Sequence, residues 1–373
     1  MHAIRSERDS QIEAKTARAG RFARVFGVLQ EAIESRAFPG CAFGVMAGGE
    51  VQVADALGTF AYEENGPAVA TDTVFDIASL TKVVSTTAIA MILVQRGELS
   101  LDMPVGELLP GFVVGRDKSE MARKVTMRHL LAHNSGLPGY IEFFRTEASA
   151  SGLFRACLGL EMKAMPGERC EYSDPGFILL GKALEIFNRE SLSAAARKDI
   201  FGPLGMRATG YRPARPRWVD IPPTEIDETF RHRRIQGEVQ DENAWILDGI
   251  AGHAGLFSNV PDLLRFAAAV LAGYKGEPSI FTRETVQLFA ERQPPEGCSR
   301  ALGWDTPSAE SSAGRYFSQN SIGHLGFSGC SLWIDLDASV AAVLLTNRTW
   351  PDRKSQSIRQ VRPSFHDAVR ESL

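Results

Sequence analysis

The sequence predicts an α/β protein of the α+β type, in which one antiparallel sheet is built from both chain ends and a second lobe is mostly helical. Two β-hairpin patterns support this prediction. Residues 41–46 and 51–56 are apolar runs around a Gly-Gly turn, and residues 329–334 and 340–346 repeat the pattern near the C-terminus. Strands at both ends that bracket a helix-rich middle are most simply joined in a single sheet.

Helical patterns flank the two hairpins. Residues 10–35 alternate charged side chains with apolar ones at helical spacing, and Pro39-Gly40 ends the pattern. A last helical stretch covers residues 352–372. We expect these terminal helices to cover the sheet.

The middle of the chain carries the other helix signals. They predict helices that begin at Ser79, over residues 126–133, over residues 175–187 and after Ser258. Residues 211–250 contain four prolines and many charges, which predicts a long loop passing near the cleft.

These signals divide the chain into two lobes. Residues 1–78 and 245–373 are expected to form the α/β sheet lobe, and residues 79–244 the helical lobe with its loop. The active site is expected in the cleft between them. A chain of 373 residues, of which 44% are hydrophobic, is long enough to bury a large core.

Composition excludes some classes of partner. A formal net charge of -4 and a pI of about 6.0 give no broad basic field for nucleic acid or an anionic membrane. No signal peptide is visible and no apolar run reaches the length of a membrane span, so a cytoplasmic location is expected. The five cysteines are odd in number, widely spaced and without a Cys-x-x-Cys pair, which favours reduced thiols.

Ser79 and Lys82 carry the strongest chemical signal. They open an almost wholly apolar helical pattern that ends at Gly97, so this helix belongs inside the protein. Ser79 lies in the first turn, where free backbone N–H groups favour negative charge, and Lys82 shares its helix face. A Ser-x-x-Lys match is expected by chance about once in such a chain, but a lysine on a buried helix is rare unless paired or functional.

A nucleophilic serine also needs a proton acceptor and oxyanion donors. Tyr172 precedes a predicted helix and can present its phenol to a cleft, although a packed core tyrosine is the alternative. Lysine and tyrosine titrate at about 10.4 and about 10, so either a buried Lys82 becomes neutral, or a charged Lys82 stabilises Tyr172 as phenolate. Both choices stay open. The small residues of segment 323–329 predict a strand edge on which a substrate backbone can pair.

Five segments, in order, resemble the serine β-lactamase and penicillin-binding protein family, particularly its class C β-lactamase, D,D-peptidase and carboxylesterase branch. They are the lead into Ser79, residues 97–104, residues 130–138, Tyr172-Ser173-Asp174 and His324-Leu325-Gly326. The resemblance implies a β-lactamase/transpeptidase-like fold, Ser79 as nucleophile, and Lys82 with Tyr172 as the proton-shuttling pair. It also implies an oxyanion hole formed by the N–H groups of Ser79 and Phe327.

The chain departs from this family's pattern at expected substrate-binding residues. The β-lactamase members have Asn where this chain has Asp174, and Lys-Thr-Gly where it has His324-Leu325-Gly326. A histidine is mostly neutral at pH 7 and Asp174 would repel an anion, so both changes weaken recognition of a β-lactam carboxylate. Esterase-type and amidase-type members commonly carry a His-x-Gly strand.

A narrower likeness lies in residues 237–244 and 249–258, which resemble the branch of the muropeptide amidases, enzymes that split N-acetylmuramic acid from its stem peptide. The predicted function is a serine hydrolase that cleaves a small carboxylic ester or amide through an acyl-enzyme on Ser79. A muropeptide amidase, a D,D-peptidase or β-lactamase, and a non-turnover penicillin-binding sensor are the alternatives. The predicted partner is a small-molecule ester or amide, with a peptidoglycan fragment as one candidate, and neither nucleic acid nor membrane.

No metal or other cofactor is predicted. His129 and His133 are four residues apart on a predicted helix, but no glutamate lies between them and no third ligand is apparent, so both are expected to be structural. His253 either lines the cleft or packs a loop. Cys330 is expected in the sheet core, because nothing nearby marks a base for it.

Overall fold

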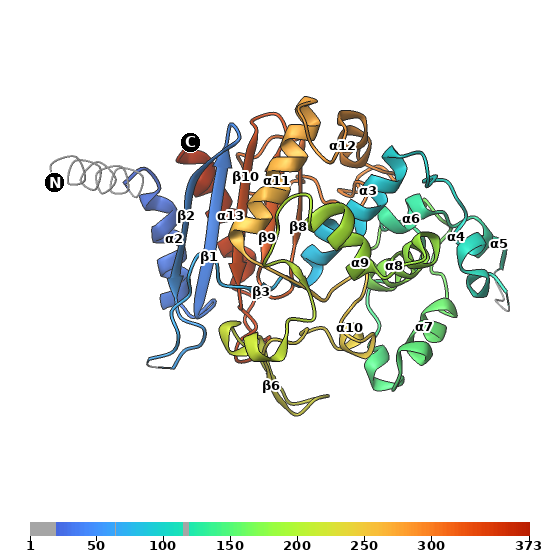
Figure 1. Ribbon diagram of the computed structural model, residues 1–373, viewed down its shortest axis with the longest axis horizontal. Helices are drawn as coiled ribbons and strands as arrows, with labels where there is room; N and C mark the ends of the chain where they lie inside the picture. The colour runs from blue at the N-terminus through green and yellow to red at the C-terminus, as the bar shows by residue number, and fades with distance from the viewer. Residues whose placement is uncertain (1–19, 64, 115–118) are drawn as a thin grey trace.

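The computed structural model describes residues 20–63, 65–114 and 119–373 (Figure 1). Its main sheet has five antiparallel strands in the order β2-β1-β10-β9-β8. These are β1 (Gly40–Ala47), β2 (Glu50–Gly58), β8 (Ser321–Leu325), β9 (Ser331–Asp335) and β10 (Val340–Thr346). The predicted α+β class and the sheet built from both chain ends are confirmed.

The two predicted hairpins form because their turns suit the strand twist. Gly48 and Gly49 both have positive φ, at 60° and 86°, which is what a two-residue turn between β1 and β2 requires. β1 then joins the halves of the sheet, since it pairs with β2 on one side and with β10 on the other. Every residue of β10 is buried, as expected for a central strand covered on both faces.

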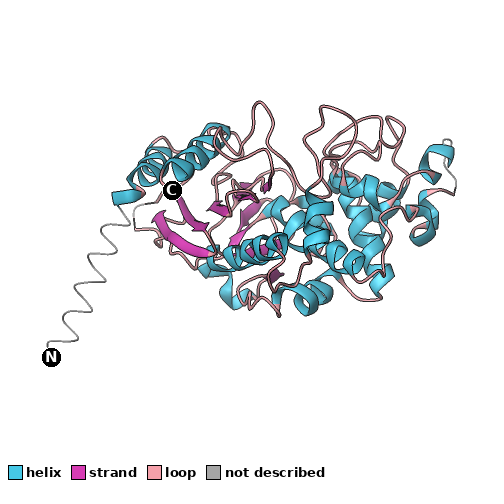
Figure 2. Cartoon of the chain, turned by 90° about the horizontal axis from the view of Figure 1, so that it is seen from above, coloured by secondary structure: helices cyan, strands magenta, loops and turns pink. Residues whose placement is uncertain are grey.

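Helices cover both faces of this sheet (Figures 1 and 2). The terminal helices α2 (Ala23–Glu34) and α13 (Ile358–Glu371) pack on one face, where Phe43 of β1 meets Phe365 at 6.1 Å between ring centroids. Helix α11 (Val260–Lys275) packs on the other face, so closely that a Cβ on Gly44 would lie 2.6 Å from Val260. The part of the N-terminal prediction over residues 10–19 lies outside the described residues.

The rest of the chain is largely helical (Figure 1). The helices are α3 (Ala88–Gln95), α4 (Val105–Leu108), α5 (Ser119–Arg123), α6 (Met127–Leu131), α7 (Ala150–Leu158), α8 (Asp174–Asn188), α9 (Leu192–Ala196), α10 (Glu242–Ile246) and α12 (Arg283–Ala290). This part of the chain also contains two small sheets. One has three strands in the order β3 (Phe75–Asp76), β7 (Leu256–Ser258) and β4 (Gly210–Tyr211), and the other pairs β5 (Glu225–Asp227) with β6 (Arg233–Ile235). The predicted lobe boundaries at residues 78 and 244 stay a prediction.

The helix that begins at Ser79 is built in three parts. A 3-10 turn (Ala78–Leu80) is followed by a π-helical turn (Lys82–Thr87) and then by α3. Residues 78–95 are long and apolar enough for a membrane span, unlike the sequence expectation, but 83% of them are buried inside the fold. Burial of this kind identifies a core helix, as the pattern predicted.

Two element predictions need correction. Residues 211–250 are not a structureless loop, because they contain β5, β6 and α10. Asp227 holds the β5–β6 turn by accepting hydrogen bonds from the backbone N–H groups of Thr229, Phe230 and Arg231, which is an Asx-type turn. The proline and charge content of the segment does not reveal such a turn. The last helix begins at Ile358 rather than near residue 352.

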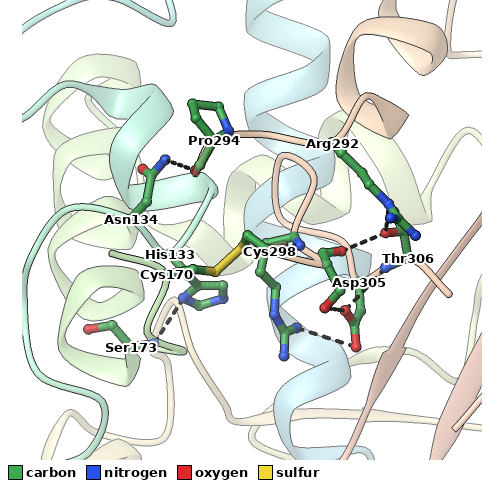
Figure 3. Close-up of a disulfide and its surroundings, with 11 residues drawn as sticks. His133, Asn134, Cys170, Ser173, Arg292, Pro294, Cys298, Asp305 and Thr306 are labelled. Atoms are coloured by element: carbon green, nitrogen blue, oxygen red, sulfur yellow. Dashed lines mark hydrogen bonds and ion pairs between the residues drawn. A yellow bond between two sulfur atoms is a disulfide. The ribbon is translucent and has the colours of Figure 1, made fainter. Parts of the chain in front are cut away.

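The prediction of five reduced thiols is wrong for two of them. Cys170 and Cys298 form a disulfide across 128 residues of sequence (Figure 3). Their Cα atoms lie 6.0 Å apart, a proximity that arises only from the tertiary fold. Cys41, Cys157 and Cys330 are free and buried, so Cys330 lies in the core as expected. The cytoplasmic location stays a prediction. The disulfide argues against it, because such bonds form mainly in oxidising compartments.

Candidate active site

Ser79 is presented by a strained turn. The preceding residue, Ala78, has a φ of 47°, a left-handed conformation that costs a non-glycine residue about 1–3 kcal/mol. The buried carboxylate of Asp76 holds this turn, because Oδ1 accepts from the N–H of Ala78 at 2.8 Å and Oδ2 from the N–H of Gln240 at 2.7 Å. Burial raises the pKa of Asp76 to about 6. Sequence reasoning missed Asp76, although its place three residues before Ser79 was visible.

Lys82 is fully buried, and besides the hydroxyl of Tyr172 its Nζ has three oxygen neighbours. Its Nζ lies 3.0 Å from Ser79 Oγ, 3.0 Å from the carbonyl oxygen of His253 and 2.7 Å from Asp174 Oδ1. An ammonium has three N–H groups for these oxygens, whereas a neutral amine has two. Burial lowers the pKa of Lys82, but the carboxylate of Asp174 and the phenol of Tyr172 outweigh it and raise the pKa. Lys82 therefore stays charged at neutral pH.

Tyr172 meets both Ser79 and Lys82. Its hydroxyl interacts with both side chains, and the centroid of its ring lies 4.8 Å from Lys82 Nζ. Burial raises the pKa of Tyr172, the charge of Lys82 lowers it and that of Asp174 raises it, with a net increase. The three predicted catalytic side chains are thus brought together.

The segment around Tyr172 is fixed from two sides. His133 Nδ1 accepts from the N–H of Ser173 at 2.9 Å, and its ring packs 4.6 Å from that of Tyr172. On the other side Arg300 lies 5.0 Å over the Tyr172 ring. Arg300 follows Cys298, which the disulfide joins to Cys170 (Figure 3). His133 therefore has a structural contact that orients the phenol, and His129 lies apart from it, in the cap of α6 with Thr126.

The predicted oxyanion donors are free to act. Ser79 and Phe327 both line the cavity, and within the described part of the chain neither N–H donates to a protein acceptor. Gly326 brings the two together, because a Cβ there would lie 2.5 Å from the carbonyl oxygen of Ile77 in the lead to Ser79. The N–H of Gly326 itself donates to the carbonyl oxygen of Cys330 at 2.7 Å, so it is not available for an oxyanion.

His324 is a buried, neutral acceptor. Its Nδ1 lies 2.9 Å from the carbonyl oxygen of Leu325, which can only accept, so Nδ1 carries the proton. Nε2 then presents a lone pair and has no partner among the described residues. Burial lowers the pKa of His324 well below its ordinary value, and the charges of Lys82 and Arg300 lower it further.

The substrate-facing strand is only partly open. β8 is an edge strand, as the Gly-rich segment predicted, but Asp305 pairs with Gly323 through two backbone hydrogen bonds of 2.8 and 2.9 Å. A substrate backbone can therefore pair only beyond Gly323, beside Leu325. The predicted substrate-binding residue Asp174 also has another partner, since its carboxylate is paired with Lys82.

These side chains surround one cavity of about 630 Å³. It is lined by the Ser79 turn, residues 139–142, the Tyr172 segment, residues 240–242, β8 with the turn after it, and the start of α13. Its residues include Ser79, Tyr140, Tyr172, Asp174, Asp241, Arg300, His324, Phe327, Arg348, Arg353 and Arg362. His253 does not line it with its ring, which is buried and pairs through Nε2 with Asp241 at 2.9 Å. Its carbonyl group nevertheless holds Lys82.

One group of carboxylates in the described chain has metal-ligand spacing: Glu225, Asp227 and Glu242. Arginines already occupy its oxygens. Arg353 pairs with both glutamates, and Arg231 Nε lies 2.9 Å from Asp227. This cluster is therefore an internal ion-pair network that fastens residues 225–242 beside the cavity.

The fold, and the meeting of serine, lysine and tyrosine in one cavity, agree with a serine hydrolase of the Beta-lactamase family. The chain belongs to the Beta-lactamase family, which matches residues 25–362. It is 29% identical over 312 residues to an N-acetylmuramyl-L-alanine amidase of Bacillus subtilis, covering 74% of this chain and 68% of that protein. It is 28% identical over 303 residues to a putative D-alanyl-D-alanine carboxypeptidase of Salmonella typhi, covering 74% and 70%.

Solved structures show the same fold. The hydrolase EstCE1, described as having promiscuous acyltransferase activity, matches with a TM-score of 0.75 and 22% identity, over 95% of this chain and 100% of that one. A penicillin-binding protein homologue from Caulobacter crescentus matches with a TM-score of 0.74 and 20% identity, over 95% and 98%.

Proposed function

We propose that this protein hydrolyses a small carboxylic ester or amide through an acyl-enzyme on Ser79. The contact that supports this most directly is the 3.0 Å distance between Lys82 Nζ and Ser79 Oγ, with Tyr172 interacting with both. A pocket that only binds a ligand needs no such proton relay. The complete set of three side chains therefore favours an enzyme over a non-turnover sensor.

The mechanism follows from the charge of Lys82. Because Lys82 stays an ammonium, it serves as electrostatic support for the phenolate form of Tyr172, which its raised pKa makes a small fraction at neutral pH. That phenolate takes the proton of Ser79 while Oγ attacks the carbonyl carbon. The N–H groups of Ser79 and Phe327 receive the developing oxyanion. Tyr172 then gives the proton to the leaving oxygen or nitrogen, and water attacks the acyl-enzyme with Tyr172 again as base.

His324 bears on the choice of substrate. Its free Nε2 lone pair favours a substrate that offers an N–H or O–H donor beside β8 and disfavours a carboxylate at that place. Amides of the muropeptide type present such donors. The 29% identity to the Bacillus subtilis amidase makes a muropeptide amidase the second candidate.

One substrate panel tests the proposal: p-nitrophenyl butyrate, nitrocefin and a muramoyl dipeptide, with mass spectrometry of the trapped protein to locate the acyl group. Turnover of the ester alone supports an esterase, and release of the sugar acid supports the amidase. Nitrocefin should be cleaved slowly or not at all, because the residue at position 324 of β8 is a neutral histidine and not a cation that would bind the β-lactam carboxylate. A stable adduct on Ser79 without turnover would indicate a sensor, and rapid cleavage of nitrocefin would contradict the role given to His324.

Asp174→Asn should raise activity at pH 7. The base must be unprotonated to act, so kcat/KM rises as pH increases through its pKa. The carboxylate of Asp174 raises the pKa of both Lys82 and Tyr172, so its removal moves the rising limb to lower pH, whichever of them is the base. We expect a gain of roughly three- to tenfold at pH 7. The pH dependence of kcat/KM measures it.

The matched control for this experiment is Asp102→Asn. Asp102 is an exposed carboxylate paired with Arg128 at 2.8 Å, and its loss should leave the pH profile in place. If the pH profile of Asp174→Asn coincides with that of the wild type, or moves to higher pH, the ion pair between Asp174 and Lys82 does not raise the pKa of the catalytic base.

A further inference from the structure

Arg362 of helix α13 reaches the turn that carries the expected oxyanion donor. Its guanidinium donates to three backbone carbonyl groups between β8 and β9: Nη2 lies 2.5 Å from the oxygen of Gly326 and 2.8 Å from that of Cys330, and Nε lies 3.3 Å from that of Gly329. Arg362 lies outside the five segments that resemble the β-lactamase and penicillin-binding protein family. It lies far along the chain from Ser79 and near it only in the fold.

This guanidinium is a buried charge without a counter-charge. The residue is 7% exposed, and in the described part of the chain no carboxylate lies within ion-pair distance of it. Burial lowers its pKa to about 10, which still leaves it protonated at neutral pH. Buried charges are normally paired. A buried guanidinium without a carboxylate is therefore either stabilised by its hydrogen bonds alone or kept because its positive charge acts on a nearby group.

The covalent structure of the chain connects Arg362 with the oxyanion hole. The carbonyl group of Gly326 and the N–H of Phe327 belong to the same peptide unit. A cation that holds the carbonyl oxygen draws electron density from the whole unit, and hydrogen bonds in such a chain strengthen one another. The carbonyl of Gly326 also accepts from the N–H of Gly329 at 3.0 Å, so the orientation of this peptide is fixed from two directions.

We propose that Arg362 is a positioning residue for the oxyanion hole: it orients and polarises the peptide between Gly326 and Phe327, and its unneutralised charge favours the negative oxygen of the tetrahedral intermediate. The inference rests on the proposed acyl-enzyme function. Arg362 is among the residues that line the cavity, but the hydrogen bonds of its guanidinium go to the backbone carbonyl groups of this turn. It acts through the N–H of Phe327.

The chain offers a matched control for a merely structural role. Arg348 also has a largely buried guanidinium, 6% exposed, and its Nε donates to the carbonyl oxygen of Phe327 at 2.8 Å. That carbonyl belongs to the next peptide unit, whose N–H is that of Ser328. Arg348 also lines the cavity, and its guanidinium lies 4.4 Å from the centroid of the Phe327 ring, but it makes no hydrogen bond to the carbonyl oxygen of Gly326. It is therefore matched to Arg362 in place and charge and differs in the peptide unit that it holds.

The experiment compares Arg362→Met, Arg362→Lys and Arg348→Met with the wild type on p-nitrophenyl butyrate. We expect Arg362→Met to lower kcat by about 10- to 100-fold with KM within about threefold, and Arg362→Lys to recover most of the loss. Arg348→Met should lower kcat by much less. Inhibition by an alkyl boronic acid, whose adduct places a negative oxygen in the hole, should weaken in parallel with kcat.

A second measurement does not depend on turnover or on full stability. Infrared difference spectra of the acyl-enzyme with ¹³C-labelled acyl groups report the carbonyl stretch, which falls as the hole polarises the ester. In Arg362→Met the band should move to higher wavenumber than in the wild type and in Arg348→Met. An unmoved band, or equal losses of kcat in the two methionine variants, overturns the inference and leaves the acyl-enzyme mechanism standing. Absence of turnover and of any acyl adduct in the wild type would instead overturn the proposed function.

Discussion

Replacing Ser79 with alanine is expected to lower kcat on p-nitrophenyl butyrate by about 10⁴-fold or more, because removal of a nucleophile leaves only binding and the oxyanion donors to act. No acyl adduct should then form at any pH. Steady-state kinetics and the mass of the trapped protein measure the two effects. The fold should survive, since Ser79 is partly exposed to the cavity and its loss buries no unpaired charge.

Ser85 supplies the matched control for this variant. It lies on the same helix two turns further on, is buried, and accepts a hydrogen bond from the hydroxyl of Tyr211 at 2.9 Å, so it also pairs with a tyrosine but lies outside the cavity. Ser85→Ala should keep kcat within a few-fold of the wild type. Comparable losses in Ser79→Ala and Ser85→Ala would mean that damage to the helix, rather than loss of a nucleophile, explains the result.

Tyr172→Phe is expected to have the second largest effect, a fall in kcat of about 10²- to 10⁴-fold, which is the usual contribution of general acid–base catalysis. Phenylalanine keeps the ring against His133 and Arg300, so KM should change little. The phenol oxygen is lost, and with it the group that takes the proton of Ser79. The alkaline rise of kcat/KM should become flat, which a pH series between 6 and about 10.5 would show.

Tyr211→Phe is the corresponding control. It removes a phenol that bonds to a serine of the same helix but interacts with neither Lys82 nor the cavity. It should cost some stability and little activity. If Tyr172→Phe keeps kcat within tenfold of the wild type, the proton passes to another group, and the neutral form of Lys82 would have to be considered as the base.

The sequence was informative wherever function depends on local spacing. A serine and a lysine three residues apart at the start of an apolar helix must share a face, and the structure places them 3.0 Å apart. Apolar runs on either side of Gly48-Gly49 likewise predicted the first hairpin, because glycine readily takes the positive φ values that a two-residue hairpin turn needs. Both predictions needed no knowledge of distant residues.

The features that sequence reasoning missed all depend on contacts across the fold. The substitution at Asp174 was noticed, but its pairing with Lys82 was not, since it requires α8 to lie beside the Ser79 helix. The disulfide joins two cysteines that are 128 positions apart in the sequence. The hydrogen bond from Arg362 to Gly326 joins residues that are 36 positions apart. No periodicity or motif marks such pairs. Secondary-structure propensity likewise could not show that hydrogen bonds to Asp227 would hold the β5–β6 turn within residues 211–250.

The disulfide has a practical consequence for anyone who handles this protein. Cys170 lies two residues before Tyr172, and Cys298 two residues before Arg300, whose guanidinium lies over the Tyr172 ring. A single covalent bond thus clamps together the two backbone segments that carry these facing side chains. We therefore expect dithiothreitol to loosen the contact between Arg300 and Tyr172, so rates are to be compared between samples kept with and without it.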